Sequence, residues 1–553
     1  MVTCTVEEEQ KVEPVKPPET TSKKNPYSVE NVTQAFENLV ARSVGRIKIA
    51  PPSTTHNYVR FQPQNLDQVM TLQDLGYDLW DEPLDQHIEY SGDYYQHPGL
   101  PDSLNYFYTL IPENYAIIQS VPHTILSQVI LFDDNAGDEQ DIEDDPWIPI
   151  PDPENCPDLY NPNCPCYEGP CARTSGDDKV DLREDLVRKT TKYLLEGGVD
   201  LLELYTQMMI LAGYEDDLTE PDASGRVQQQ CNYHPAGQIL VRDNSINLNV
   251  PVRGTLIKAR RFMKLKKTYT NAKGNFFIPT VFCKKAQVIV KFKNDWAKVR
   301  GVNGGLKVWQ WTHPVKVKLG LFEKTAMENI THTFQYTANA DTRQAMQFTA
   351  AHVINTVFDV NQYCAANNIN TIPNNINLWV TTSNWFSSST APMLHKVLEP
   401  AQTLSWVSTF LQPAGPLTLL RALRSVLLRY APDVVITMNN DSQNGPTKTA
   451  QETVGVAFHE LGHAVHYNKV GRTYWLSVIA QYVSNYLRTS TAYGNKNNLS
   501  AVVESWGYFI GHTFTERKYR PLNPNIANEQ INRLERQRRD DSVPRRFNNS
   551  LNV

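Results

Sequence analysis

Two histidines and a glutamate near the C-terminal end of the chain have the spacing of a metal site. The stretch Phe458–Tyr467, FHELGHAVHY, places His459 and His463 four residues apart, with Glu460 directly after the first histidine. On a helix, residues four apart lie on one face, so both imidazoles can bind one Zn²⁺ ion at about 2.0–2.1 Å. Glu460 then points aside, where it can accept a hydrogen bond from water at the metal. The alternative is a buried helix that merely contains histidines.

The surrounding residues predict the helix that this site needs. Thr449 and Glu452 are spaced as a capping box at the start, and Gly471 supplies a stop. An apolar stripe runs along the segment at near-helical spacing: Val454, Phe458, Leu461 and Val465. Burying two histidines and a glutamate without partners on such a helix is costly, and a bound metal removes that cost.

A catalytic zinc site needs a third protein ligand and one open position. The metzincin pattern is excluded, because it requires glycine at 466 and a ligand at 469, where this chain has His466 and Lys469. Glu504 stands alone among apolar residues in SAVVESWGYFIGHTF and is the main candidate. His512 and Glu516 compete with it, and Glu504 could instead form an ion pair with an arginine.

With HELGH and a downstream glutamate, the chain resembles the gluzincin metallopeptidases. The resemblance implies that His459, His463 and Glu504 bind zinc and that Glu460 is the general base of a peptidase. Many relatives place an acid four residues after the ligand glutamate, to support a ligand histidine. Here that position is Tyr508, so the support must come from elsewhere, and a backbone carbonyl is one candidate.

Two further groups would complete a peptidase site. The oxyanion donor is open among Tyr508, His512, Tyr493 and His466. In zincins an edge strand just before the metal helix pairs with extended substrate, and DVVITMNND occupies that place. We therefore expect a peptide or protein substrate.

The whole chain also resembles zinc-binding metallopeptidase lipoproteins of Bacteroidota. The resemblance runs through NYVRFQP, PLDQHIEYSGDYYQHP, a β-sandwich region and VVESWGYFIGH. There is no signal peptide, but Cys4 precedes an acidic, Pro-rich tail, as after cleavage of a lipoprotein signal. The expected location is extracytoplasmic, with a lipid anchor at Cys4 on the cell surface or in the periplasm. Thr3 fits poorly in the small-residue position before a lipidated cysteine. The alternative is that Cys4 is a stray cysteine in a flexible tail.

Four more cysteines crowd into one stretch: Cys156, Cys164, Cys166 and Cys171. They lack the paired C-x-x-C spacing of common zinc modules. Local disulfides are therefore favoured, which leans toward an oxidising compartment.

The element pattern predicts a multidomain α+β protein. We expect a small N-terminal α/β module, a prealbumin-like β-sandwich and a mainly helical zincin domain. The predicted segments are a disordered tail (1–55), an N-terminal module (56–132), an acidic Cys-containing linker with helices (133–235), the sandwich (236–322), the zincin domain (323–530) and a basic tail (531–553).

The sandwich region is strongly basic. From Arg253 to Lys318 it has seventeen lysines and arginines against one acidic residue, Asp295. Aromatic residues lie among them, so a polyanion-binding surface is one interpretation. The simpler one is a sheet with aromatics inside and lysines outside. In a third, the acidic linker, with eleven acidic residues between 133 and 158, neutralises this face.

The bulk composition excludes little. The chain has 553 residues, 41% of them hydrophobic, and its net charge of −6 favours no particular partner. No apolar run is long enough for a transmembrane helix. The sequence predicts a zinc-dependent peptidase. The alternative is a cell-surface ligand- or glycan-binding lipoprotein whose zincin domain is structural or inactive.

Overall fold

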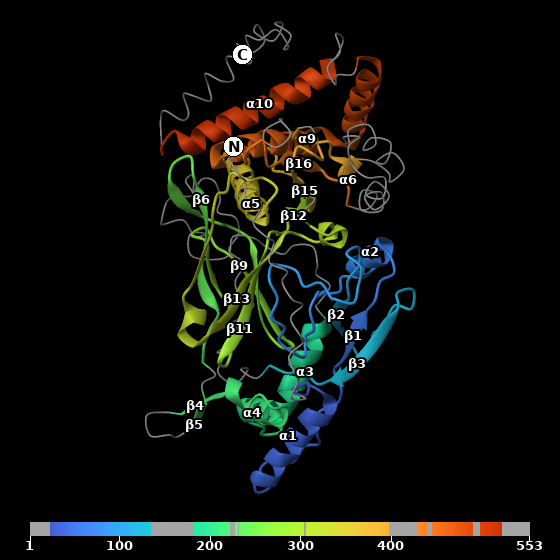
Figure 1. Cartoon of the computed structure of the whole chain (residues 1–553), viewed down its shortest axis with the longest axis vertical. Coiled ribbons are helices and arrows are strands. Elements are labelled where there is room, and N and C mark those ends of the chain that lie inside the picture. The colour runs from blue at the N-terminus through green and yellow to red at the C-terminus, as the bar shows by residue number, and fades with distance from the viewer. Residues whose placement is uncertain are drawn as a thin grey trace, which may run out of the picture.

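The computed structural model combines helices with several sheets, most of them antiparallel, so the predicted α+β class is confirmed (Figure 1). None of its described helices is long and apolar enough to cross a membrane. The structure describes residues 23–133, 182–221, 227–229, 232–303, 306–386, 388–397, 430–439, 445–489 and 498–522. Cys4, the cluster Cys156–Cys171, most of the acidic linker and the basic tail lie outside these ranges.

The N-terminal module is a three-stranded antiparallel sheet with one short helix. Strand β1 (His56–Phe61) lies between β2 (Phe107–Pro112) and β3 (His123–Val129). Helix α2 (Leu66–Asp74) begins at Asn65, whose side chain accepts a hydrogen bond from the Gln68 amide. The strand predicted at NYVRFQP and the helix predicted before Gly76 are both confirmed.

The chain before residue 55 corrects one prediction. A disordered tail is expected through residue 55, in which PYSVENVTQAFENLVARSV could form one short helix. Helix α1 (Val29–Arg42) forms in that stretch, but it is no part of a tail, because it buries Val32 and Phe36 in the core. It packs on α4 (Leu201–Leu211), where Asn31 Nδ2 donates to the Met208 carbonyl at 2.8 Å. That partner comes from a distant part of the chain, so local composition does not reveal the contact.

Helices α3 (Leu182–Glu196) and α4 are separated where the sequence predicts a break, at Gly197 and Gly198. Gly198 has a φ of +77°, which favours glycine. A short hairpin follows, with β4 (Thr219–Pro221) and β5 (Val227–Gln229).

Two four-stranded sheets form the central layer. The first contains β10 (Asn275–Phe277), β6 (Ala236–Asp243) and β14 (Ile330–Phe334), with β7 (Leu248–Pro251) on β6. The second has the order β13 (Lys316–Glu323), β11 (Lys285–Lys291), β8 (Leu256–Arg261), β9 (Lys264–Tyr269). Ile239 and Val241 of the first sheet share a core with Ile257 and Val288 of the second. A prealbumin-like topology stays a prediction.

The sandwich does not end where the sequence predicts. Strand β14 lies beyond residue 322 and pairs in parallel with β6. Strand β12 (Ala297–Val302), by contrast, leaves the sandwich and pairs in parallel with β15 (Ile376–Thr381). Both pairings join segments far apart in sequence, which strand propensity alone does not determine.

The C-terminal region is mainly helical and is built around the parallel sheet β12–β15–β16, with β16 spanning Val434–Thr437. Helix α5 (Arg343–Ala366) is buried along most of its length beside this sheet. Short α6 (Leu394–Val397) follows β15. Helices α9 (Ala450–Thr489) and α10 (Asn498–Tyr519) lie at the opposite end of the molecule from α1 and α4 (Figure 1).

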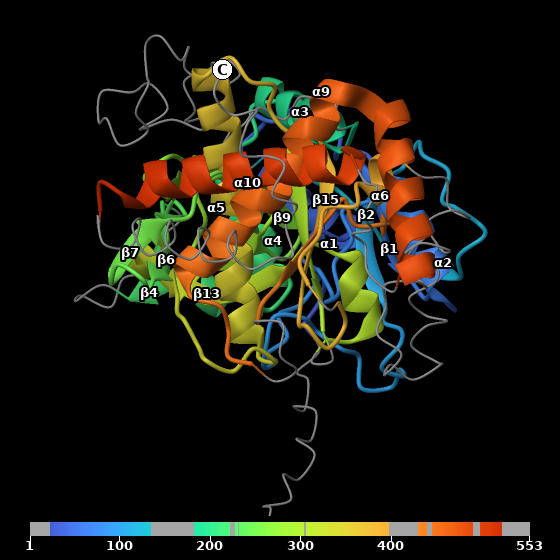
Figure 2. The same ribbon diagram turned by 90° about the horizontal axis from the view of Figure 1, so that it is seen from above.

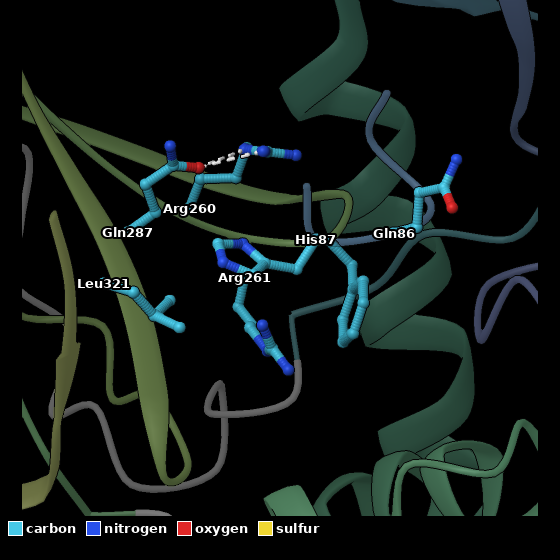
Figure 3. A pocket seen from close by; sticks show the side chains of 7 residues that line it. Gln86, His87, Arg260, Arg261, Gln287 and Leu321 are labelled. Carbon is cyan, nitrogen blue, oxygen red and sulfur yellow. Dashed lines mark hydrogen bonds between the residues drawn. The ribbon is translucent and has the colours of Figure 1, made fainter. Parts of the chain in front are cut away.

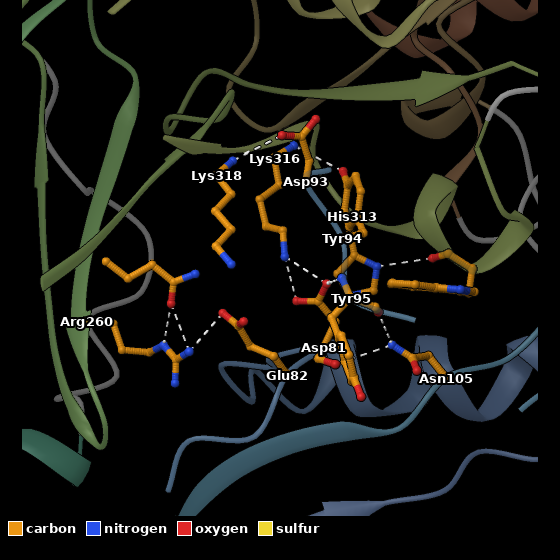
Figure 4. Close-up of polar contacts among 12 residues, drawn as sticks. Asp81, Glu82, Asp93, Tyr94, Tyr95, Asn105, Arg260, His313, Lys316 and Lys318 are labelled. Atoms are coloured by element: carbon orange, nitrogen blue, oxygen red, sulfur yellow. Dashed lines mark hydrogen bonds and ion pairs between the residues drawn. The ribbon is translucent and has the colours of Figure 1, made fainter. Parts of the chain in front are cut away.

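The basic face of the sandwich packs against the N-terminal module through buried ion pairs. Lys316 Nζ lies 2.6 Å from Asp81, and Arg260 lies 2.9 Å from Glu82 (Figure 4). Acids of the module therefore neutralise part of this face, whereas the acidic stretch from 134 to 158 lies outside the described residues. From the predicted linker region, Asp133 contacts Lys266 at 2.6 Å, and Asp217 pairs with Arg261 and lies 3.6 Å from Lys285.

One small pocket lies on the same interface, beside His87, Arg260 and Arg261 (Figure 3). It has room for about one water molecule. Burial, followed by the charges of Arg261 and Lys318, lowers the pKa of His87 to about 4. A neutral His87 beside two arginines in so small a space belongs to the packing of the interface.

Candidate metal centre

The first part of α9 begins as the sequence predicts. The Thr449 amide donates to the Glu452 carboxylate at 2.9 Å, and the Glu452 amide donates back to Thr449 Oγ1 at 3.3 Å. This reciprocal pair is a capping box. Gly471, with a φ of +82°, interrupts the helix, and a second helical segment follows it. The predicted stop is therefore a kink.

Lys448 connects the start of α9 to the end of β16. Its buried ammonium donates to the Thr437 carbonyl at 2.9 Å and to the Asn439 carbonyl at 2.5 Å. The helix that carries the two histidines is thus fixed to the parallel sheet β12–β15–β16 just before its first turn.

His459 and His463 project from one face of α9, with their Nε2 atoms 3.2 Å apart. The ring of His463 is buried, while 19% of the His459 side chain is exposed. The lone pairs of two ring nitrogens this close repel each other unless a proton or a cation lies between them.

Glu504 comes from α10, which crosses the first part of α9 (Figure 2). Its Oε2 lies 3.3 Å from His459 Nε2 and 3.8 Å from His463 Nε2. These three residues are the one group of potential metal ligands in the described part of the chain, with ligand atoms within 4.8 Å of one another. The structure therefore brings the three predicted ligands together.

Glycines allow the two helices to cross so closely. A Cβ atom on Gly507 would lie 2.6 Å from His463 Cε1 and 3.0 Å from His459 Cε1. A Cβ on Gly511 would lie 3.1 Å from His459 Cα. Sequence reasoning missed both positions, although residues 504, 507 and 511 follow the i, i+3, i+7 spacing of one helix face.

Glu460 lies beside the three ligands and is buried. Its Oε2 is 4.0 Å from His463 Nε2. Burial raises the pKa of Glu460 to about 8, the charge of Glu504 adds to this, and His459 and Lys448 oppose it. Two carboxylates in one poorly hydrated place are costly in their ionised form, and a cation between them would remove the cost.

The two histidines have opposite pKa shifts. Burial lowers the pKa of His463 to about 4. Burial also acts to lower the pKa of His459, but its contact with Glu504 and the nearby acidic charges outweigh this and raise it. A neutral His463 is the form that binds metals.

The spacing of the three donor atoms fits a tetrahedral zinc ion. Four ligands at about 2.05 Å from a tetrahedral centre lie about 3.3 Å apart. The observed separations are 3.2 Å between the histidines and 3.3 and 3.8 Å from Glu504 to His459 and His463. Two imidazoles and one carboxylate are also the donors of one common class of catalytic zinc site.

Backbone carbonyls act on the pKa of both candidate ligand histidines, and Tyr508 stands where an acid is expected. The Gly507 carbonyl contributes to the raised pKa of His459, and the Val503 carbonyl acts in the same direction on His463. Nδ1 of His463 nevertheless lacks a well-aligned hydrogen bond to any described residue.

Tyr508 lies directly beside the cluster. Its ring contacts His459 edge-on, with centroids 4.7 Å apart, and 47% of Tyr508 is exposed. Burial of part of the side chain, followed by the charges of Glu504 and Glu460, raises its pKa. The phenol therefore keeps its proton at neutral pH.

The other predicted candidates lie elsewhere. His512 pairs with Glu516 at 3.8 Å, and both lie outside the ligand cluster. His512 is eight residues beyond Glu504, about 12 Å along the helix axis. His466 packs between Trp475 and Trp506, with ring centroids 5.6 and 6.2 Å away. Tyr493 lies outside the described residues.

The outer edge of β16 is already paired, which corrects the predicted substrate strand. The Val435 amide donates to the Thr390 carbonyl at 2.7 Å, and the Thr390 amide donates back at 3.0 Å. The Thr437 amide donates to Ser389 Oγ at 3.0 Å. A peptide therefore cannot add at Val435 or Thr437 without displacing this segment.

Comparison of the chain with protein-family models, with curated proteins and with solved structures finds no match.

Proposed function

We propose that this protein is a zinc-dependent peptidase. His459, His463 and Glu504 would hold the ion, and Glu460 would act as general base. The observation that supports this is the near-tetrahedral spacing of three donor atoms, at 3.2, 3.3 and 3.8 Å, on two crossing helices. Three protein ligands leave a fourth position open, as catalysis requires.

When bound, a zinc ion supplies Lewis-acid catalysis and lowers the pKa of water toward neutrality. Glu460 would accept the proton of the attacking water and return it to the leaving amine. Its carboxylate lies 4.0 Å from His463 Nε2, close enough to reach a reactant at the open position without binding the ion itself.

Tyr508 is the best-placed donor for the oxyanion among the described candidates. Its ring packs on His459, and it retains its proton because its pKa is raised. Developing negative charge on the scissile carbonyl oxygen would accept the phenol hydrogen bond.

The decisive experiment compares three matched glutamine variants. Glu460→Gln is expected to keep one zinc per chain and to lose cleavage of a peptide library, because only the base is removed. Glu504→Gln is expected to lose zinc as well, because a ligand is removed. Glu516→Gln, on the same helix but outside the cluster, is the control and should retain both properties. Mass spectrometry measures the zinc content of each variant. Digestion of the peptide library with and without chelator measures its cleavage activity.

Two results would contradict the proposal. Cleavage by Glu460→Gln would remove the general-base role. Zinc-loaded wild type that cleaves no peptide would favour the alternative, a surface ligand- or glycan-binding protein with an inactive zincin domain.

We also propose an extracytoplasmic location with a lipid anchor at Cys4. The supporting observation is that Cys283 is disulfide-bonded, which is typical of oxidising compartments. Growth of a lipoprotein-competent host with labelled fatty acid should label the wild-type protein and leave Cys4→Ala unlabelled. Equal labelling of both would contradict the anchor.

A further inference from the structure

Five lysines of the sandwich share one face, and we call them the lysine cluster. Lys258 of β8 lies directly opposite Lys267 of β9. Lys291 of β11 lies one diagonal step from Lys258. Lys293 follows two residues later and is bridged to Lys298. Diagonal neighbours on paired strands are about 7–8 Å apart, within reach of lysine side chains. Lys293 lies just beyond the end of β11, where its amide donates to the Lys291 carbonyl at 2.8 Å, and the charge of Lys258 acts on both Lys291 and Lys293.

Two members of the lysine cluster, Lys291 and Lys293, make no direct ion pair with a described acid. Lys258 pairs with Asp78 at 2.5 Å. For the ammonium groups of Lys291 and Lys293, the described residues provide neither an ion pair nor a hydrogen bond. Lys291 lies only near the ring of Trp80, 5.7 Å from its centroid.

The neighbouring cations on the same face, by contrast, form ion pairs. Lys316 lies opposite Lys291 in the sheet and is neutralised by Asp81 at 2.6 Å. Arg260, two residues after Lys258, is neutralised by Glu82 at 2.9 Å. The acids of the N-terminal module thus pair with Lys316, Arg260 and Lys258 but not with Lys291 or Lys293.

The crowding has an energetic cost. Burial, followed by the charge of Lys258, lowers the pKa of Lys291 well below its usual range. Burial and the charges of Lys258 and Lys298 lower the pKa of Lys293 to about 8. A bound anion would remove this cost, since it restores the solvation and the opposite charge that the ammonium groups lack.

The lysine cluster also reaches the surface. Lys267 is exposed, Lys291, Lys293 and Lys298 are partly exposed, and 38% of the Asp78 side chain is exposed. A ligand can therefore enter from solvent at the seam between the sandwich and the N-terminal module.

We propose that the lysine cluster binds a tetrahedral oxyanion, a phosphate or sulfate group. Lysine ammonium groups act as point charges toward such groups, with rotatable donors. Two uncompensated ammonium groups match a doubly charged anion better than a single carboxylate. The site is independent of the zinc centre.

The test is titration of the full chain with inorganic phosphate and with inorganic sulfate, at constant ionic strength set by chloride. Calorimetry is expected to give one saturable site. Lys291→Met/Lys293→Met should bind at least tenfold more weakly, because methionine keeps the apolar stem and removes the charge. Lys192→Met, at an exposed position of α3, should bind like the wild type.

Thermal unfolding separates a binding role from a merely structural one. In chloride alone, the double variant should be at least as stable as the wild type, because repulsion has been removed. In phosphate, only the wild type should gain stability. If the double variant does not fold, Lys293→Met alone serves the same comparison. Absence of saturable binding to the wild type, or equal binding by the double variant, would overturn the proposal.

A third titration identifies the source of the anion. A heparin hexasaccharide that binds and is displaced by phosphate assigns the site to sulfate esters of a glycan. Binding of the inorganic ions alone assigns it to free anions. Both outcomes support the oxyanion site, whereas heparin binding that the double variant retains would contradict it.

Discussion

At the scale of single residues, the candidate centre depends on where three side-chain atoms lie. The imidazoles of His459 and His463 approach to 3.2 Å, and Glu504 lies against both. The carboxylate of Glu460 is buried and lies 4.0 Å from His463 Nε2. The arrangement separates the groups that would hold a metal from the group that would move a proton.

Tyr508→Phe tests the oxyanion role at this scale. We expect kcat to fall by about 10²–10³, the loss typical for one oxyanion donor, with KM and zinc content almost unchanged. Steady-state kinetics on the best peptide from the library measure this. His512→Asn is the matched control, because His512 lies about 12 Å from Glu504 along the axis of α10. Equal losses in both variants would contradict a specific role for Tyr508.

At the scale of elements, the site exists because α10 crosses α9 at close range. Gly462 lies under Ile510, where a Cβ atom on the glycine would be only 3.0 Å from Ile510 Cβ, and Gly507 lies over the two imidazoles. Lys448 and the capping box at Thr449 hold the other end of the α9 segment. Close packing, rather than helix propensity, therefore places Glu504.

Gly507→Ala tests that packing. A Cβ 2.6 Å from His463 must push α10 away or displace the ring. We expect zinc affinity to fall at least tenfold and the free energy of unfolding to fall by about 1–3 kcal/mol, as for other overpacked positions. Ser505→Ala, on an exposed position of α10, should change stability by less than about 0.5 kcal/mol. Competition with a fluorescent chelator measures the zinc affinity, and urea unfolding measures the free energy of unfolding.

At the scale of the whole molecule, one buried carboxylate joins the sandwich to the helical region. Asp359 of α5 lies 2.6 Å from Arg253, which precedes β8, and 2.8 Å from Lys518 of α10. All three side chains are almost completely buried. The helix that carries Glu504 is thus tied at its far end to the central sheets.

Asp359→Asn should be strongly destabilising. It leaves two buried cations without their counter-charge, which typically costs about 3–5 kcal/mol. Urea unfolding at pH 7 measures the loss. The control is Asp185→Asn, which removes a partly exposed carboxylate that pairs with the exposed Arg188. A loss no larger than in the control would contradict the role of Asp359.

The same carboxylate predicts a pH dependence. Burial acts to raise the pKa of Asp359, but Arg253 and Lys518 outweigh it and lower the pKa. Its contribution is therefore complete above the unfolded value of about 3.9 and disappears as pH falls through the lower folded value. Stability measured between pH 5 and pH 2 should fall less steeply in Asp359→Asn than in the wild type.

The sequence alone determined the local features of the candidate centre. The capping box, the i, i+4 histidines, the break at Gly471 and the strands that became β15 and β16 follow from near-neighbour spacing. Glu504 could be singled out because an isolated carboxylate in an apolar helix needs a partner.

The tertiary structure alone decided the rest. Three features join segments that are distant in sequence. These are the packing of α1 on α4, the parallel pairing of β12 with β15, and the pairing of β16 with Ser389 and Thr390. The separation between Glu504 and the histidines depends on the crossing of two helices at Gly507 and Gly511. Spacing along a chain fixes which residues share a face, but the distance between two faces is set by the side chains packed between them.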